Sequence, residues 1–103
     1  MQVNSQTPRP QRVFYALASL PRRQIIALLS QAASSTSDLA ERFRMSRPAV
    51  SRHLSVLQRA GLVAGERQGQ RVLYRLKRDA LLEALARFAS EVDGPLRRPR
   101  NAI

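Results

Sequence analysis

The sequence predicts a mainly α-helical domain with a β-hairpin, its elements following in the order α-α-α-α-β-β-α. Two observations predict this class. Apolar residues recur at helical spacing before residue 60 and again after residue 79, and residues 62–77 alternate around a central glycine. At 103 residues the chain has room for one domain, which we expect at 12–93. Residues 1–11 and 94–103 lack a repeating apolar face, so we predict a flexible N-terminal arm and a flexible basic C-terminal tail.

The first two helices are indicated by their apolar faces. A short first helix, ending near Ser19, has one face formed by Val13, Phe14 and Leu17. Pro21 suits the first turn of a second helix, because the N–H that proline lacks has no partner there. This helix has a broad apolar stripe formed by Ile25, Ile26, Leu28 and Leu29.

A tight turn joins the third and fourth helices. Ser35 and Asp38 have the spacing of a capping box, in which side-chain oxygens satisfy the free amides at a helix start. Ser46 can cap the next helix in the same way. Only Arg44 and Met45 lie between the two helices, which is the spacing of a helix-turn-helix.

The fourth helix, expected at 47–60 and ended by Gly61, has two contrasting sides. Its buried side consists of Val50, Leu54 and Leu57. Its opposite side consists of Arg52, Ser55 and Arg59, flanked by Pro48 and Ser51. The outward side is therefore small, polar and cationic, as a helix that enters a DNA groove must be.

A hairpin and a closing helix complete the domain. Residues 62–67 and 71–77 are predicted strands around Gln68-Gly69-Gln70, with Gly69 at the bend. Asp79 is expected to cap the closing helix. That helix has a wide apolar stripe formed by Leu81, Leu82, Leu85, Phe88, Ala89 and Val92. The whole order is that of a winged helix-turn-helix domain.

Positive charge is concentrated on the helix-turn-helix and the hairpin. The net charge is +11, and every one of the 18 cationic residues except Lys77 is an arginine. Residues 42–75 contain eight arginines and a single acid, Glu66, whereas acids outnumber cations in the closing helix. Arginine presents a planar fork of donors that matches phosphate oxygens and guanine edges, so the pattern favours a nucleic-acid partner.

We predict that double-stranded DNA contacts the fourth helix and the hairpin tip. Arg52 is placed to form two hydrogen bonds with a guanine in the major groove. The helix start at Ser46 points backbone amides toward a phosphate, and the hairpin tip can reach an adjacent minor groove. The predicted DNA-binding residues are Arg44, Ser46, Arg47, Pro48, Ser51, Arg52, Ser55, Arg59, Arg67, Gln68, Gln70 and Arg71.

The stretch LAERFRMSRPAVSRHLSVLQRAGLV, followed by GQRVLYRL, resembles the ArsR/SmtB family of bacterial repressors over about residues 12–93. The most specific part of the resemblance is the pattern formed by Ser46, Val50, Ser51, His53 and Leu54. It implies a homodimeric winged-helix repressor that binds an inverted repeat in a promoter, usually its own. In that family the first and last helices commonly build the dimer interface, which here implies Val13, Phe14, Leu17, Leu81, Leu85, Phe88 and Val92.

The sequence departs from the metal-sensing members of this family. It contains no cysteine, and its one histidine, His53, lies on the fourth helix rather than in the closing helix. We therefore expect neither a metal nor a cofactor, and we expect His53 to pack beside Leu54 and Leu57 or to bond a phosphate. Leu20 occupies a place where related sequences often have aspartate, which leaves Ser19 as the nearby helix cap. A regulating small molecule, a regulating protein partner and constitutive repression remain equally compatible with the sequence.

Two functions other than specific repression are also compatible with the sequence. One is a basic architectural protein that coats DNA through phosphates, and the other is a winged-helix module that binds an acidic protein. An enzyme is not expected, because the chain has no cysteine, no second histidine and no glycine-rich phosphate loop. Neither a signal peptide nor a membrane span is evident, so we expect a cytoplasmic protein.

Overall fold

The computed structural model describes residues 10–93; the predicted tail and residues 1–9 of the predicted arm lie outside them. The elements are α1 (Pro10–Leu17), α2 (Leu20–Leu29), β1 (Ser34–Ser35), α3 (Thr36–Phe43), α4 (Arg47–Arg59), β2 (Val63–Gln68), β3 (Arg71–Leu76) and α5 (Arg78–Val92). The predicted order is confirmed, with β1 added. Pro10 and Gln11, which we assigned to the arm, form the first turn of α1.

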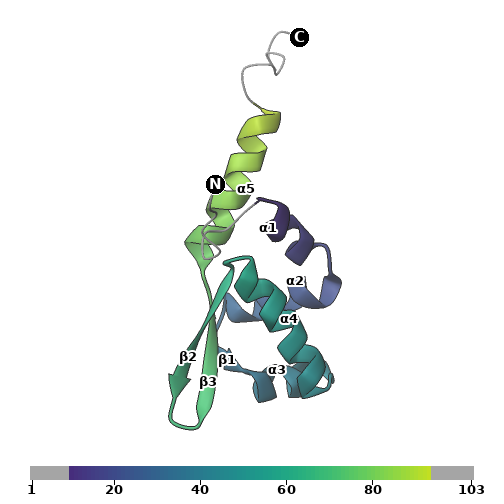
Figure 1. The fold of residues 1–103 in the computed structure, drawn as a ribbon, viewed down its shortest axis with the longest axis vertical. Helices are drawn as coiled ribbons and strands as arrows, with labels where there is room; N and C mark the ends of the chain where they lie inside the picture. The colour runs from purple at the N-terminus through teal and green to yellow at the C-terminus, as the bar shows by residue number, and fades with distance from the viewer. Residues whose placement is uncertain (1–9, 94–103) are drawn as a thin grey trace, which may run out of the picture.

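The core lies among the first four helices and the base of the hairpin (Figure 1). Its largest fully buried side chains come from every one of these elements, and they are Val13, Ile25, Leu39, Val50, Leu54, Leu57 and Leu62. The buried side of α4 is thus the predicted one. Ala60 caps the end of α4, and Gly61 follows with a φ of 77°, the left-handed conformation expected of a glycine at this place.

A two-residue strand, β1, was not predicted. It pairs antiparallel with β3, Ser34 opposite Tyr74 and Ser35 opposite Leu73, so that the sheet order is β1-β3-β2. A strand this short has no alternating apolar pattern, which explains its absence from the sequence prediction. Because α3 begins directly after β1, the pairing fixes the hairpin against the start of α3.

The hairpin of β2 and β3 forms the wing (Figure 1). Gln68 pairs with Arg71, which leaves a two-residue turn of Gly69 and Gln70, and Gly69 has a φ of 65°. A positive φ at the first turn residue alone is typical of the type II′ turn, whose twist suits a hairpin. The predicted bend at Gly69 is confirmed.

The last helix, α5, extends away from the rest of the domain (Figure 1). None of its residues is fully buried, and Phe88 is 49% exposed although its ring meets Phe14 edge-on at 5.1 Å between centroids. The expected cap at Asp79 is wrong. The backbone N–H of Lys77 donates to the Leu62 carbonyl at 2.8 Å, and the helix begins at Arg78, which places Asp79 inside its first turn. No helix within residues 10–93 combines the length and apolar character that a bilayer crossing requires.

Candidate nucleic-acid interface

The turn between α3 and α4 is as short as predicted, and its geometry sets the direction of α4. Arg44 ends α3 with a φ of 56°, the one positive φ of a non-glycine residue within residues 10–93. The N–H of Met45 donates to the Ala40 carbonyl at 3.0 Å. Ser46 then caps α4 by accepting a hydrogen bond from the Ala49 N–H at 3.2 Å. The predicted cap at Ser46 is confirmed.

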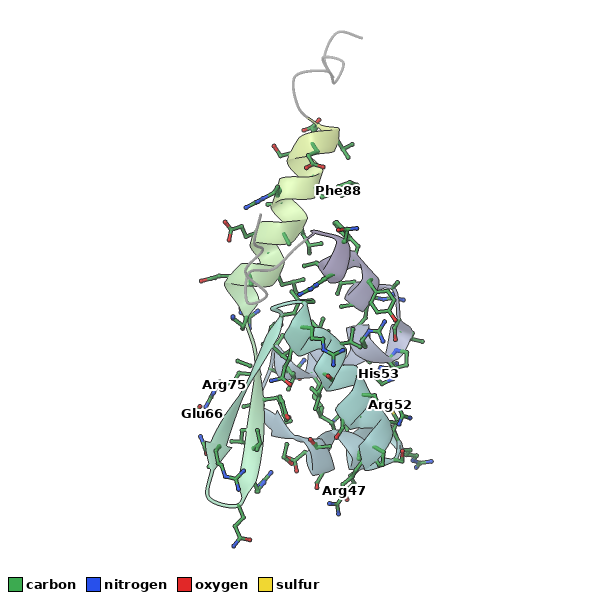
Figure 2. The ribbon with its side chains drawn as sticks, viewed as in Figure 1. Arg47, Arg52, His53, Glu66, Arg75 and Phe88 are labelled. Atoms are coloured by element: carbon green, nitrogen blue, oxygen red, sulfur yellow. The ribbon has the colours of Figure 1, made fainter. Side chains whose placement is uncertain are left out.

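The first half of α4 presents the predicted outward side. Val50 and Leu54 are buried, whereas Arg47, Ser51 and Arg52 are exposed. Figure 2 shows Arg47 and Arg52 pointing away from the domain. Nothing in the described part of the chain covers this surface, so a narrow cationic ridge is open to a DNA groove. Pro48 also lies exposed at the helix start, and Ser55 is half-buried.

Arg59 lies at the opposite end of α4 from this group. Twelve residues separate it from Arg47, which corresponds to about 18 Å along an α-helix. Its carbonyl accepts a hydrogen bond from Nη1 of Arg12 at 3.4 Å, so this end of α4 meets α1. The structure therefore places Arg59 at the end of α4 that meets α1, far from Arg47 and one turn beyond the half-buried Ser55.

The wing tip carries exposed donors on both strands. Arg67, Gln68 and Gln70 are all exposed. Arg71, the fourth predicted residue of this group, is held by the start of α3: its Nη2 donates to Oδ2 of Asp38 at 2.7 Å and to Oγ of Ser35 at 3.1 Å. The Arg71 guanidinium is thus shared between the wing and α3.

The capping box at the start of α3 is confirmed. The Ser35 N–H donates to the Asp38 carboxylate at 3.0 Å, and the Asp38 N–H donates to Oγ of Ser35 at 3.1 Å. The bond from the Ser35 backbone, followed by the Ser35 side chain and the Arg71 guanidinium, lowers the pKa of Asp38 below 3.8. On the wing, Glu66 pairs with Arg75 at 3.3 Å, so Asp38 and Glu66 are each matched by an arginine of β3.

A buried arginine, which sequence analysis missed, contacts α4 from the interior of the domain. Arg22 is 9% exposed. Its Nε donates to the Ala16 carbonyl at 2.8 Å, its Nη2 donates to the Tyr15 carbonyl at 3.1 Å, and its Nη1 lies 3.3 Å from Nδ1 of His53. The guanidinium also lies over the Tyr15 ring at 5.2 Å. One side chain therefore joins the end of α1, the start of α2 and the middle of α4.

This contact determines the state of His53. An arginine has donors only, so Nδ1 of His53 must accept and the ring proton must lie on Nε2. Burial, followed by the charges of Arg22 and Arg52, lowers the pKa of His53 below 6.5. The half-buried imidazole is therefore neutral at pH 7, and it bonds Arg22, a partner we had not predicted. Within residues 10–93 no three histidine, aspartate or glutamate side chains are grouped to hold a metal ion.

The residues expected at a dimer interface fall into two groups. Leu85, Phe88 and Val92 are exposed on α5. Phe14, Leu17 and Leu81 are half-buried: Leu17 and Leu81 pack against the core, and the Phe14 ring meets Phe88. Val13 is fully buried in its own domain, which leaves it no surface for a partner, so we correct its assignment to a core residue.

Comparison with known proteins places this geometry among bacterial regulators. Residues 21–64 match the family model described as bacterial regulatory protein, arsR family. The transcriptional repressor SdpR from Bacillus subtilis is 34% identical over 73 residues, which cover 71% of this chain and 81% of SdpR. Several of the other curated relatives are longer, and the matched segment spans less than two thirds of their length.

Solved structures share the fold. An ArsR-like transcriptional regulator from Rhodococcus sp. RHA1 matches with a TM-score of 0.72 at 36% identity, over 82% of each chain. The homodimeric winged helix-turn-helix DNA-binding domain of Mb0332 from Mycobacterium bovis matches with a TM-score of 0.67 at 31% identity, over 84% of this chain and 81% of that domain. The winged helix-turn-helix fold predicted from the sequence is confirmed.

Proposed function

Because the chain belongs to the ArsR family of bacterial regulatory proteins, we propose that it is a metal-independent repressor that binds an inverted-repeat operator as a homodimer. The family consists of DNA-binding transcriptional regulators, so the chain is a regulator and not an enzyme. The observation that supports the proposal most directly is the open cationic side of α4, with Arg52 at its centre and the aliphatic side buried.

In the proposed complex, α4 lies in the major groove. Arg52 forms two hydrogen bonds with a guanine, and Ser46 and Arg47 contact phosphates beside it. The wing reaches the neighbouring minor groove with Arg67, Gln68 and Gln70. A narrow minor groove has a strongly negative potential, which attracts an arginine such as Arg67. Arg59 is left out of this complex, since it lies at the α1 end of α4.

In the proposed dimer, α1 and α5 of two copies pack together. The exposed apolar residues of α5 support this arrangement, and the related Mb0332 domain is described as homodimeric. The dimer would hold two copies of α4 one DNA turn apart, about 34–36 Å. A regulator bound to bacterial promoters works in the cytoplasm, which is where we place this protein.

The experiment is a binding titration with DNA from upstream of the protein's own gene and with a shuffled duplex of equal length. We expect a clear preference for the promoter, and Arg52→Ala should lose about 1–3 kcal/mol at one base position. Arg87→Ala is the matched control, because that exposed arginine lies on α5 beside Glu83. Equal weakening on both duplexes would indicate an architectural protein. Binding to neither duplex below about millimolar concentration would favour a protein-binding module.

A further inference from the structure

A cleft lies between α1 and the end of α4, and most of the residues that line it belong neither to the hydrophobic core nor to the proposed DNA-binding surface. It measures about 430 Å³ and is lined by Gln11, Arg12, Tyr15, Val56, Arg59 and Ala60. This volume falls within the range of sites that hold small organic ligands. The cleft lies at the far end of α4 from Arg47, so DNA in the proposed complex does not fill it.

The lining residues define the chemistry of a ligand. Arg12 and Arg59 supply two guanidinium groups, and no acidic side chain within residues 10–93 forms an ion pair with either of them. Val56 and Ala60 supply an apolar wall, and Tyr15, which is 64% exposed, lines the cleft beside them. Paired guanidinium groups bind carboxylates through charge-assisted bonds, while the apolar wall and the ring favour a flat hydrocarbon body.

We propose that this cleft binds an organic monocarboxylate with an aromatic body. Its carboxylate lies between Arg12 and Arg59, and its ring packs on Tyr15 and Val56. A simple inorganic anion would leave the apolar wall uncovered, and a neutral aromatic compound would leave both guanidinium groups without a counter-charge.

The site is connected directly to α4. Nη1 of Arg12 donates to the Arg59 carbonyl, one of the carbonyls at a helix end that has no partner within the helix. A carboxylate that binds Arg12 competes for this donor and releases the last turn of α4. Tyr15 provides a second connection, because its carbonyl binds Arg22, which contacts His53 on α4. Binding should therefore lower operator affinity, a consequence that rests on the proposed function.

The test of the site uses 2-naphthoate as the probe and nuclear magnetic resonance of the full chain without DNA. We expect saturable amide shifts centred on the six lining residues. Arg12→Gln should weaken binding at least about tenfold, because a charge-assisted bond is lost. Val56→Phe, which fills the cleft, should weaken it as well. Arg23→Gln, a change at an exposed arginine of α2, should leave binding unchanged.

Two further probes separate the parts of the proposal. 2-Naphthamide, which lacks the charge, and acetate, which lacks the ring, should both bind much more weakly than 2-naphthoate. The proposal is overturned if 2-naphthoate shifts only α5 amides, if Arg12→Gln binds like the wild type, or if the cleft amides respond to protein concentration instead of the probe. The last result would show that a second copy of the chain covers the cleft.

A separate titration with operator DNA tests the regulatory consequence. Added 2-naphthoate should weaken operator binding several-fold for the wild type and leave Arg12→Gln unaffected. If 2-naphthoate binds in the cleft of the wild type but does not change its operator affinity, the proposed regulation is overturned and the proposed binding site is not. Failure of the ligand-free protein to prefer its operator would instead count against the proposed function.

Discussion

The buried guanidinium of Arg22 contacts the imidazole of His53 at 3.3 Å, and this contact joins the N-terminal helices to α4. Arg22 reaches His53 from a position fixed by two carbonyls of α1, those of Ala16 and Tyr15. Arg52, the arginine proposed to bind a guanine, comes directly before His53 in α4, so the Arg22 contact lies next to it in the helix.

Arg22→Met should destabilise the domain strongly. The substitution removes the guanidinium, so the Ala16 carbonyl loses its side-chain donor and the Tyr15 carbonyl keeps only the Ala18 N–H, at a cost of about 2 kcal/mol or more in the free energy of unfolding. Denaturant unfolding measures this cost. Arg23→Met is the matched control: Arg23 donates to the Leu17 carbonyl at the exposed surface, so its loss should stay within about 0.5 kcal/mol. Equal costs for the two variants would refute the role of burial.

Stability should fall as the solution is acidified from neutral pH. The folded state lowers the pKa of His53 below 6.5, so the unfolded chain binds this proton more readily. The stabilising effect of neutral His53 is complete above about pH 6.5 and is lost as pH falls through the folded pKa. Unfolding curves between pH 5 and 8 should show this decline, and His53→Gln should remove it. Asp38 adds its own decline only below 3.8, because its pKa is lowered from that value.

Ser35→Ala should cost more than about 1 kcal/mol of folding free energy, which is the usual effect of deleting an N-cap. The loss is larger because Oγ of Ser35 also accepts a bond from Arg71. Thermal or denaturant unfolding measures the change. Ser37→Ala, at an exposed position inside α3, is the control and should have an effect near zero. A Ser37 effect as large as the Ser35 effect would argue against the cap.

Gly65→Ala should weaken the wing. A Cβ at Gly65 would lie 2.9 Å from Cε1 of Tyr74 and 3.0 Å from Cγ1 of Val72, so the ring must move. We expect a loss of about 1–3 kcal/mol, as for other overpacked sites. Denaturant unfolding tests this, and the loss should shrink when Tyr74→Ala is also present. Persistence of the full loss in the double variant would show that the ring is not the cause.

Phe88→Glu should produce a monomer if the proposed dimer is correct. The charge would be placed in the apolar face of α5, where a second copy is expected to cover it. Analytical ultracentrifugation measures the molar mass of both proteins. Glu91→Gln is the control on the same helix and should leave the mass unchanged. If Phe88→Glu is still a dimer, the interface lies on another face of the protein.

Local chemistry made much of the fold predictable. The caps at Ser35 and Ser46 and the bend at Gly69 each depend on a few neighbouring residues, and all three are confirmed. Ser19, the expected N-cap of α2, accepts a hydrogen bond from the Arg22 N–H at 3.3 Å. Such features are predictable because hydrogen bonds three residues apart or a positive φ leave a clear sequence pattern.

Features that depend on distant contacts were missed. Strand β1 exists because β3 lies beside it, and α5 begins at Arg78 because Lys77 bonds Leu62 and Arg78 bonds the Ser30 carbonyl. Arg22 did leave a signal: with Ile25, Ile26 and Leu29 it occupies the buried face of α2 at helical spacing. A charged residue at such a position indicates a buried partner, which only the folded chain identifies as His53.

The exposed side of α4 was predictable from the sequence, but its extent along the helix was not. Helical spacing correctly separates Arg52 from Leu54, because the period of the helix fixes their directions. The same spacing groups Arg59 with Arg52, although the far end of the helix meets α1 instead. Sequence likewise does not show that Asp38 holds Arg71.

The absence of any fully buried residue in α5 has a consequence for hydrogen exchange. The α5 helix contacts its domain through half-buried residues near its start and through one ring contact. In a single copy of the chain, few contacts therefore oppose local opening of the backbone hydrogen bonds at its far end. Amide hydrogens near Val92 should therefore exchange with deuterium sooner than those near Leu54, and dilution of the protein should widen that gap if a second copy normally shields them.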